Sequence, residues 1–154
     1  MKKNILLIIA FVFAGILNAQ GVLTFNLTFN HLALSVKDVD RSADFYKKVL
    51  TLKEITNLAK VDDMRCLSLS GNKQLHLISI GKKNIVVDTA IHFAFATHNF
   101  DAFLNRMDKM KIPYEDTDGK PHTFNIRADG VKQNYFQDPD GYWIEVNNMR
   151  KKKS

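Results

Sequence analysis

The chain has 154 residues, enough for one domain or for two small modules that share a core, and its formal charge is +6 at pH 7. The surplus cations lie in the N-terminal MKK and in the C-terminal run RKKK, so the body of the chain is near neutral and lacks the basic face expected of a nucleic-acid-binding protein. A single cysteine, Cys66, excludes an internal disulfide and a thiolate metal cluster.

Residues 1–19 are predicted to form a secretory signal peptide. A basic start is followed by an apolar run over 5–17 and by a small residue, Ala19, at a plausible cleavage position. The run is shorter than the roughly 20 residues of a membrane-spanning helix, although an uncleaved anchor remains the alternative. We therefore expect an exported protein, periplasmic or secreted, without a stable membrane anchor after processing. Residues 20–28 would then be an N-terminal extension, and 149–154 a basic tail.

The first predicted module, 29–81, contains a strand, a helix and three further strands. Alternation in FNHLALSV predicts the first strand. Asp38 is expected to cap a helix over VDRSADFYKKVL, whose apolar residues share one face. Three strands are then expected around 53–58, 64–70 and 74–80, with SGNK as a tight turn between the last two.

The same order returns in the second predicted module, 89–148. AIHFAFAT predicts a strand, and NFDAFLNRMDKM predicts a helix that Asn99 caps and that ends before Pro113. A short strand is expected at 114–116, followed by a loop rich in Gly and Pro. VKQNYFQ and GYWIEVNN are expected to pair across the turn DPDG. The predicted fold class is α+β, with two βαβββ modules that build a cup-shaped mixed β-sheet with helices on the outside.

Each module carries polar residues at matching places on its first and last strands. HLALS and HFAFA both begin with histidine and alternate small with large residues, which leaves room above one face of the sheet. In the last strands, QLHLISI contains His76 and GYWIEVNN contains Glu145, a carboxylate that is costly to bury unless it is paired or bound to a metal. Three imidazoles and one carboxylate suit a single divalent Zn, Ni, Co, Fe or Mn ion. The predicted metal ligands are His31, His76, His92 and Glu145.

The doubled pattern, opened by HLALSVKDVDRSADFYKKVL and closed by QDPDGYWIEV, resembles the vicinal oxygen chelate superfamily over residues 29–148. That superfamily includes glyoxalase I (lactoylglutathione lyase), extradiol dioxygenases, methylmalonyl-CoA epimerase and the fosfomycin and bleomycin resistance proteins. The resemblance implies a metal at the floor of the cup and a small substrate of the 2-oxo or hemithioacetal type that chelates through adjacent oxygens. It also implies that Glu145 is the catalytic residue, which moves a proton while the metal stabilises an enediolate. The modules can pair within one chain or across a homodimer.

Glyoxalase I is the member that the second module resembles most, but the chain departs from it. His76 stands where glyoxalase I often has a second glutamate, so Glu145 would act as the base alone. Ser35 and Ile80 replace an arginine and an asparagine that bacterial glyoxalase I often carries. Export also argues against a glutathione substrate, because reduced thiols are scarce outside the cytoplasm.

The resemblance also indicates where a substrate would be held. Arg127 and Lys132 lie at or near the position of a basic substrate-binding loop of the family, and Trp143 shares the strand face of Glu145, so these three residues are the predicted substrate contacts. A surface or capping role is expected for His98, and His122 is a weaker candidate for a substrate contact.

Three functions remain open from the sequence. The first is a glyoxalase-like lyase or isomerase. The second is an Fe(II) dioxygenase of the extradiol type, whose open coordination positions a fourth protein ligand would crowd. The third is a small-molecule binding or resistance protein that does not require a metal.

Overall fold

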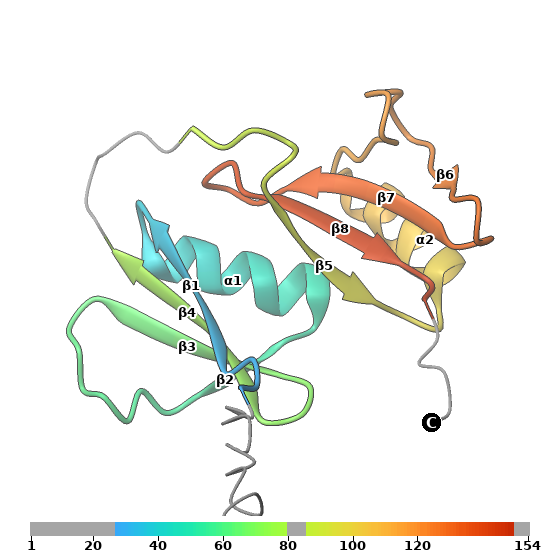
Figure 1. The fold of residues 1–154 in the computed structure, drawn as a ribbon. Coiled ribbons are helices and arrows are strands. Elements are labelled where there is room, and N and C mark those ends of the chain that lie inside the picture. Colours follow the sequence, from blue (N-terminus) through green and yellow to red (C-terminus); the bar gives the residue numbers. More distant parts are fainter. Residues whose placement is uncertain (1–26, 80–85, 150–154) are drawn as a thin grey trace, which may run out of the picture.

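The computed structural model describes residues 27–79 and 86–149, which form two modules of equal topology (Figure 1). The first module contains β1 (His31–Val36), α1 (Val39–Leu50), β2 (Lys53–Ile55), β3 (Met64–Leu69) and β4 (Lys73–Ser79). The second contains β5 (His92–Ala96), α2 (Phe100–Met110), β6 (Asn125–Ile126), β7 (Lys132–Gln137) and β8 (Trp143–Asn147). The predicted α+β class is thus confirmed. The predicted signal peptide and nearly all of the predicted basic tail lie outside the described residues.

Each module forms its own four-stranded mixed sheet, with strand orders β1-β4-β3-β2 and β5-β8-β7-β6. In both sheets the first strand of the module runs parallel to the last, and the other pairs are antiparallel. The parallel pairing places Ala33 level with His76, and Ala94 level with Glu145. Residues that are level on adjacent strands point to the same face of a sheet, so in each sheet the small and polar residues share a face.

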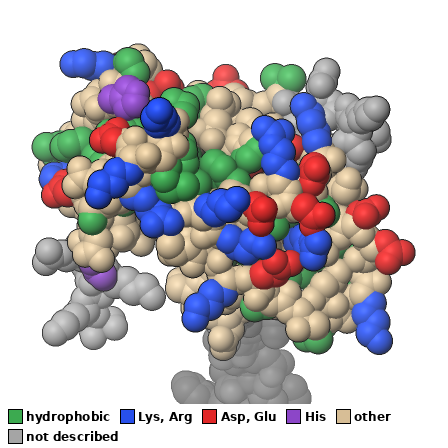
Figure 2. Space-filling view, turned by 180° about the vertical axis from the view of Figure 1, so that it is seen from behind, with side chains coloured by type: hydrophobic (Ala, Val, Ile, Leu, Met, Phe, Trp, Pro, Cys, Tyr) green, Lys and Arg blue, Asp and Glu red, His purple; other side chains and the backbone are tan. Residues whose placement is uncertain are grey.

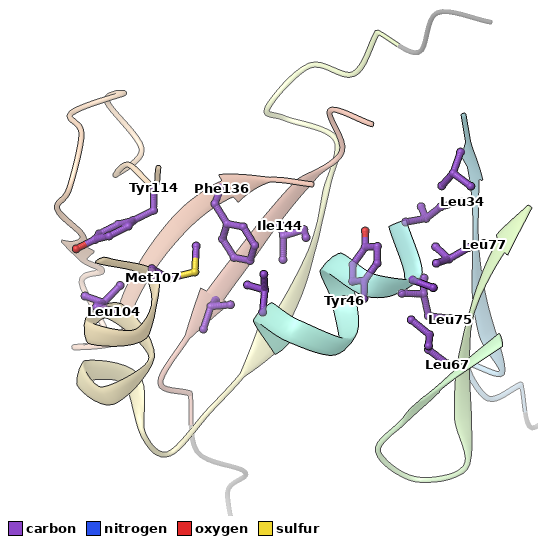
Figure 3. Packing of buried hydrophobic residues seen from close by; sticks show 14 of the residues in the cluster. Leu34, Tyr46, Leu67, Leu75, Leu77, Leu104, Met107, Tyr114, Phe136 and Ile144 are labelled. Atoms are coloured by element: carbon purple, nitrogen blue, oxygen red, sulfur yellow. The ribbon is translucent and has the colours of Figure 1, made fainter. Parts of the chain in front are cut away.

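The opposite faces of the two sheets pack against helices and form one continuous core (Figure 3). Helix α1 lies between the sheets, with Tyr46 among the core residues that it contributes. The ring of Phe136, on β7, lies 6.4 Å from Phe45 of α1 and 5.9 Å from Phe103 of α2. Because both helices contact the same ring, both lie on one face of the second sheet. Within the described residues, the sheet faces that carry the predicted metal ligands are covered by neither α1 nor α2.

Helix α1 begins as the sequence predicts, and α2 begins differently. The Asp38 carboxylate accepts the backbone N–H groups of Asp40 and Arg41 at 2.9 and 3.0 Å, which satisfies donors that a helix N-terminus otherwise leaves unpaired. Asn99 makes no side-chain capping bond, although its carbonyl oxygen accepts the N–H of Phe103 at 2.9 Å. No helix in the described ranges is both long and apolar enough to cross a membrane.

The turn between β7 and β8 anchors the second module on the helix of the first. Asp138 accepts a 2.7 Å hydrogen bond from the Tyr46 hydroxyl, and Asp140 accepts a 2.6 Å hydrogen bond from the Ser42 hydroxyl. All four side chains are buried. Gly141 has φ +92°, a conformation that glycine adopts without strain and that lets the turn close. The DPDG segment thus forms the predicted turn and also joins the modules.

One strand prediction was wrong. Residues 114–116 form no strand, and Glu115 makes only isolated bridges to Pro121 and Tyr135. The fourth strand of the second sheet is β6, two residues long, inside the segment predicted as a loop. Two residues are too short to show the alternation by which strands are recognised.

Charged side chains of both signs are interspersed on the rear face of the molecule (Figure 2). Among the exposed ion pairs, Arg65 contacts both Asp40 and Glu54. Such exposed pairs contribute about 0–1 kcal/mol each to stability, so the fold depends mainly on the core and on the buried turn contacts.

Candidate functional site

The first pair of predicted ligands, His31 and His76, lies on the helix-free face of the first sheet. Their rings are stacked with centroids 4.4 Å apart. His31 Nδ1 lies 2.7 Å from Asn30 Oδ1, and His76 Nε2 lies 2.7 Å from Gln74 Oε1. A neutral imidazole carries its proton on the nitrogen that faces an oxygen acceptor, so the other nitrogen of each ring keeps its lone pair. Both histidines are therefore oriented as metal-binding histidines are, with one nitrogen held and one free.

The protonation of His76 also suits metal binding. Burial, followed by the charge of His31, lowers the pKa of His76 from its usual value. The ring is therefore neutral at physiological pH, and neutral imidazole is the form that binds a metal ion.

The second pair, His92 and Glu145, lies on the helix-free face of the second sheet. His92 Nε2 is 3.4 Å from Glu145 Oε2, while His92 Nδ1 is 3.0 Å from the carbonyl oxygen of Thr89. The two ring nitrogens of His92 thus face two oxygen atoms, one from the backbone and one from the carboxylate. The Glu145 side chain is only 8% exposed, and a carboxylate so buried requires hydrogen-bond partners.

Two neighbouring side chains supply those partners. The Tyr135 hydroxyl donates to Glu145 Oε2 at 2.9 Å, and Asn147 Nδ2 donates to Oε1 at 2.6 Å. Gln133 Nε2 in turn donates to the Tyr135 oxygen at 3.1 Å. Burial and the hydrogen bond to Glu145 raise the pKa of Tyr135 to about 12, so the phenol remains a donor at physiological pH.

Tyr135, Asn147 and Gln133 were not among the site residues predicted from the sequence. Alternation on β7 and β8 was the available signal, because the register sets Tyr135 level with Glu145 and Gln133 level with Asn147. Four polar residues on one face of two adjacent strands would have indicated a polar floor around the carboxylate.

The two pairs do not meet within one chain. Among the described residues no group of three or more His, Cys, Asp and Glu side chains lies close enough together to hold a metal ion. One pair belongs to each of two separate sheets, and helix α1 lies between these sheets (Figure 3). The donor types fit a divalent transition metal, with imidazole nitrogens oriented by oxygen acceptors and a carboxylate held by two donors. A single chain therefore presents two half-sets of ligands.

The predicted substrate contacts lie in different places. Trp143 is level with His92 and shares its face. Arg127 is close enough to the second pair that its charge lowers the pKa of Tyr135, against the larger effect of burial, and it forms an ion pair with Asp129 at 2.8 Å. The structure therefore brings Trp143 and Arg127 towards the second pair.

Lys132 and the two remaining histidines lie elsewhere. Lys132 precedes Gln133 on β7 and so points to the helix face, where its ammonium group donates to Asp101 of α2 at 2.9 Å. The structure does not bring Lys132 together with either pair. His98 is exposed, as expected, and His122 lies in a loop with Nδ1 3.3 Å from Asp108.

Comparison with known proteins gives one family and a set of related folds. The model of the Glyoxalase/Bleomycin resistance protein/Dioxygenase superfamily matches residues 28–146. The chain is similar to the uncharacterized protein YwbC of Bacillus subtilis (strain 168), with 25% identity over 122 residues that cover 75% of this chain and 93% of YwbC.

Two solved structures illustrate the fold. Oxidase ChaP-H2 has a TM-score of 0.68 at 22% identity, over 82% of this chain and 96% of that chain. Lactoylglutathione lyase from Agrobacterium tumefaciens has a TM-score of 0.60 at 21% identity, over 79% of this chain and 92% of that chain. Similarity at these identities shows the fold alone and does not identify the reaction that the chain catalyses.

Proposed function

Because the chain belongs to the glyoxalase/bleomycin resistance protein/dioxygenase superfamily, we propose that it is a metal-dependent, glyoxalase-like lyase or isomerase. It would act on a small substrate with two adjacent oxygens, of the 2-oxo or hemithioacetal type, by moving a proton on the carbon next to a carbonyl. The observation that carries this proposal is the arrangement of Glu145, a buried carboxylate that Tyr135 and Asn147 hold and that faces His92 Nε2.

The donor set fits one divalent ion. His31, His76, His92 and Glu145 would hold it, and the ion would be Zn, Ni, Co, Fe or Mn. When bound, such an ion supplies a Lewis acid that stabilises negative charge on the substrate oxygens. The neutral state of His76 and the position of His92 Nε2 next to Glu145 support this assignment.

A second copy of the chain would complete the site. In a two-fold symmetric dimer, the helix-free face of each first module would meet the helix-free face of the partner's second module. Each of the two resulting sites would take the His31 and His76 pair from one copy and the His92 and Glu145 pair from the other. The strand orders support this arrangement, because β1 and β5 are both edge strands within their sheets and an exposed edge favours pairing with another chain.

The proton transfer would belong to Glu145. Its ionised carboxylate would take the proton from the substrate carbon and return it to the neighbouring carbon or oxygen. Tyr135 and Asn147 would keep the carboxylate in one orientation, so that it is already positioned to react when the substrate binds. Trp143 would cover the substrate from the same strand, and Arg127 would hold a negative group on it.

The experiment is to measure deuterium exchange and turnover on a panel of 2-oxoaldehydes and their thiol adducts, using protein loaded with each candidate metal. Glu145→Gln is expected to lower exchange at least about a hundredfold, since positioned acid–base groups contribute on that order. Glu115→Gln, in an irregular segment of the same module, is the matched control and should retain activity. Full exchange in Glu145→Gln with the metal still bound would refute the mechanism. Oxygen uptake with a catechol and no exchange would favour a dioxygenase.

We also propose that the protein is exported. The support is the sequence of residues 1–19, with its basic start, short apolar run and Ala19. Mass spectrometry of the protein from fractionated cells should find a mature chain beginning at Gln20. Full-length protein in the cytoplasm would contradict this proposal.

A further inference from the structure

A cavity of about 690 Å³ lies where the two modules meet, next to the C-terminal end of α1 and the N-terminal half of α2. None of the four predicted metal ligands lines it. Its size falls within the range of roughly 300–1,000 Å³ that is typical of small-molecule sites. The cavity is therefore large enough to hold a ligand of its own.

The walls of the cavity are largely apolar. The end of α1 and the hairpin between β3 and β4 form one side, while β5, α2 and β8 form the other. Aliphatic and aromatic side chains from both modules line it, namely Val49, Leu50, Leu69, Phe95, Phe103 and Val146. Such a surface favours a ligand with an apolar chain, because burying that chain removes apolar area from water.

Two cations lie at this apolar surface without a carboxylate partner. Lys73, at the start of β4, and Arg106, on α2, both line the cavity, and no Asp or Glu does. Neither cation takes part in any of the ion pairs formed among residues 27–79 and 86–149. Arg106 donates to the backbone carbonyl of Lys48, and Lys73 Nζ lies 3.4 Å from the carbonyl oxygen of Gly71. Carbonyl groups are neutral, so neither cation has an anionic partner among the described residues.

The polar groups of the cavity also suit an anion. Asn99 lines it at the start of α2, and its side chain makes no capping hydrogen bond. Thr97 lines the same space, and its hydroxyl oxygen accepts the Asn99 N–H at 3.1 Å, which leaves the hydroxyl hydrogen for another acceptor. A helix N-terminus favours negative charge nearby, which adds to the effect of the two cations.

We propose that this cavity binds a free aliphatic monocarboxylate of the fatty-acid class. The tail would lie against the apolar walls, and Arg106 and Lys73 would hold the carboxylate. A small polar anion would leave the walls unfilled, and a neutral apolar molecule would leave both cations unpaired. Ala94, which is level with Glu145, lines this site, but none of the four predicted metal ligands does, and occupancy of the site does not require a metal.

The first test is calorimetric titration of the full chain with hexanoate, octanoate and decanoate, and with decanol as the uncharged match. Affinity is expected to rise about fourfold for each added methylene group, which is the ratio that corresponds to the burial energy of one such group. Decanol should bind about tenfold or more weakly than decanoate, because hydrogen bonds to charged groups are the stronger ones. Equal affinity for decanoate and decanol, or affinity independent of chain length, would overturn the proposal.

Two variants with matched controls locate the binding. Ala102→Phe would fill the cavity from α2 and should abolish decanoate binding, whereas Asn105→Phe, on the same helix but outside the cavity, should not. Arg106→Gln should remove most of the preference for decanoate over decanol, whereas Arg41→Gln, exposed on α1, should retain it. If neither Ala102→Phe nor Arg106→Gln changes the affinity for decanoate, the ligand binds elsewhere and the proposed site is refuted. If Ala102→Phe instead changes the oligomeric state, and the unaltered chain binds no acid, the cavity is an interface between copies.

Discussion

The Tyr135 hydroxyl donates to Glu145 Oε2, the same oxygen that lies 3.4 Å from His92 Nε2. One carboxylate oxygen thus faces both a phenol that stays protonated and an imidazole nitrogen. The phenol stays protonated at physiological pH, because burial raises its pKa to about 12, so it donates to the carboxylate. Tyr135 is therefore a positioning residue, which fixes the carboxylate without competing with it for a proton.

Tyr135→Phe tests this positioning role. The variant removes one hydrogen bond to a buried charged group, which is worth about 1.5–3 kcal/mol, so kcat should fall about tenfold or more while KM changes little. Metal content and the circular dichroism spectrum should remain those of the unaltered chain. Tyr114→Phe is the control, since the hydroxyl that it removes makes a single 3.4 Å hydrogen bond, to Asp108, among the described residues. A fall in KM alone, or loss of the fold, would assign Tyr135 a different role.

Mixed dimers test whether two chains share each site. We expect that His31→Ala/His76→Ala protein and His92→Ala/Glu145→Gln protein are each inactive. After equal amounts of the two are unfolded and refolded together, about half of the dimers should be mixed and about a quarter of all sites should have four intact ligands. Turnover should therefore return to about a quarter of the unaltered value. If the refolded mixture is as inactive as each variant alone, no site is shared between chains.

Metal removal should lower thermal stability. A ligand that binds only the folded state stabilises it by about 2.7 kcal/mol at a hundred times its dissociation constant, so chelation should reduce Tm and the matching metal should restore it. His76→Ala should weaken the restoration, because it removes a neutral imidazole that is already oriented by Gln74. Cys66→Ala is the control, since burial raises the pKa of that thiol and keeps it a poor ligand. An unchanged Tm after chelation, in protein shown to have contained metal, would contradict the ligand assignment.

Much of the fold could be predicted because alternation and capping are local signals. HLALS and HFAFA determine which face carries histidine, and the structure keeps the two polar residues of each module on one sheet face. The Asp38 cap and the DPDG turn depend on neighbouring residues and were predicted for the same reason.

The features of the fold and of the site that could not be predicted depend on tertiary packing. Nothing local shows that α1 lies between the sheets, so the separation of the His31 and His76 pair from the His92 and Glu145 pair could not be predicted. The hydrogen bond of Ser42 to Asp140 joins residues 98 positions apart, and only the packed structure reveals it. Lys132 illustrates a different limit. Its place in the family pattern led to the prediction of a substrate contact, although the alternation of side chains along β7 turns it towards Asp101.

The buried turn contact of Asp138 predicts how stability depends on pH. Burial is the largest effect on Asp138 and raises its pKa above the usual value, although the hydrogen bond from Tyr46 acts in the opposite direction. A folded-state pKa above the unfolded one means that this group contributes stability that is present below the unfolded pKa. That contribution is lost as pH rises through the folded pKa. For the metal-free protein, the free energy of unfolding should therefore contain a component that declines above about pH 4.

Asp138→Asn should remove that component. The amide oxygen can still accept the backbone N–H groups of Asp140 and Tyr142, which now lie 2.9 Å from Asp138 Oδ1, and the amide nitrogen can donate to the Tyr46 oxygen. Urea unfolding across about pH 4 to pH 7, in the presence of a chelator, should give a flatter profile for this variant than for the unaltered chain. Asp40→Asn, on an exposed residue of α1, is the matched control and should leave the decline in place. A profile for Asp138→Asn that falls as steeply as that of the unaltered chain would show that the buried carboxylate is not its source.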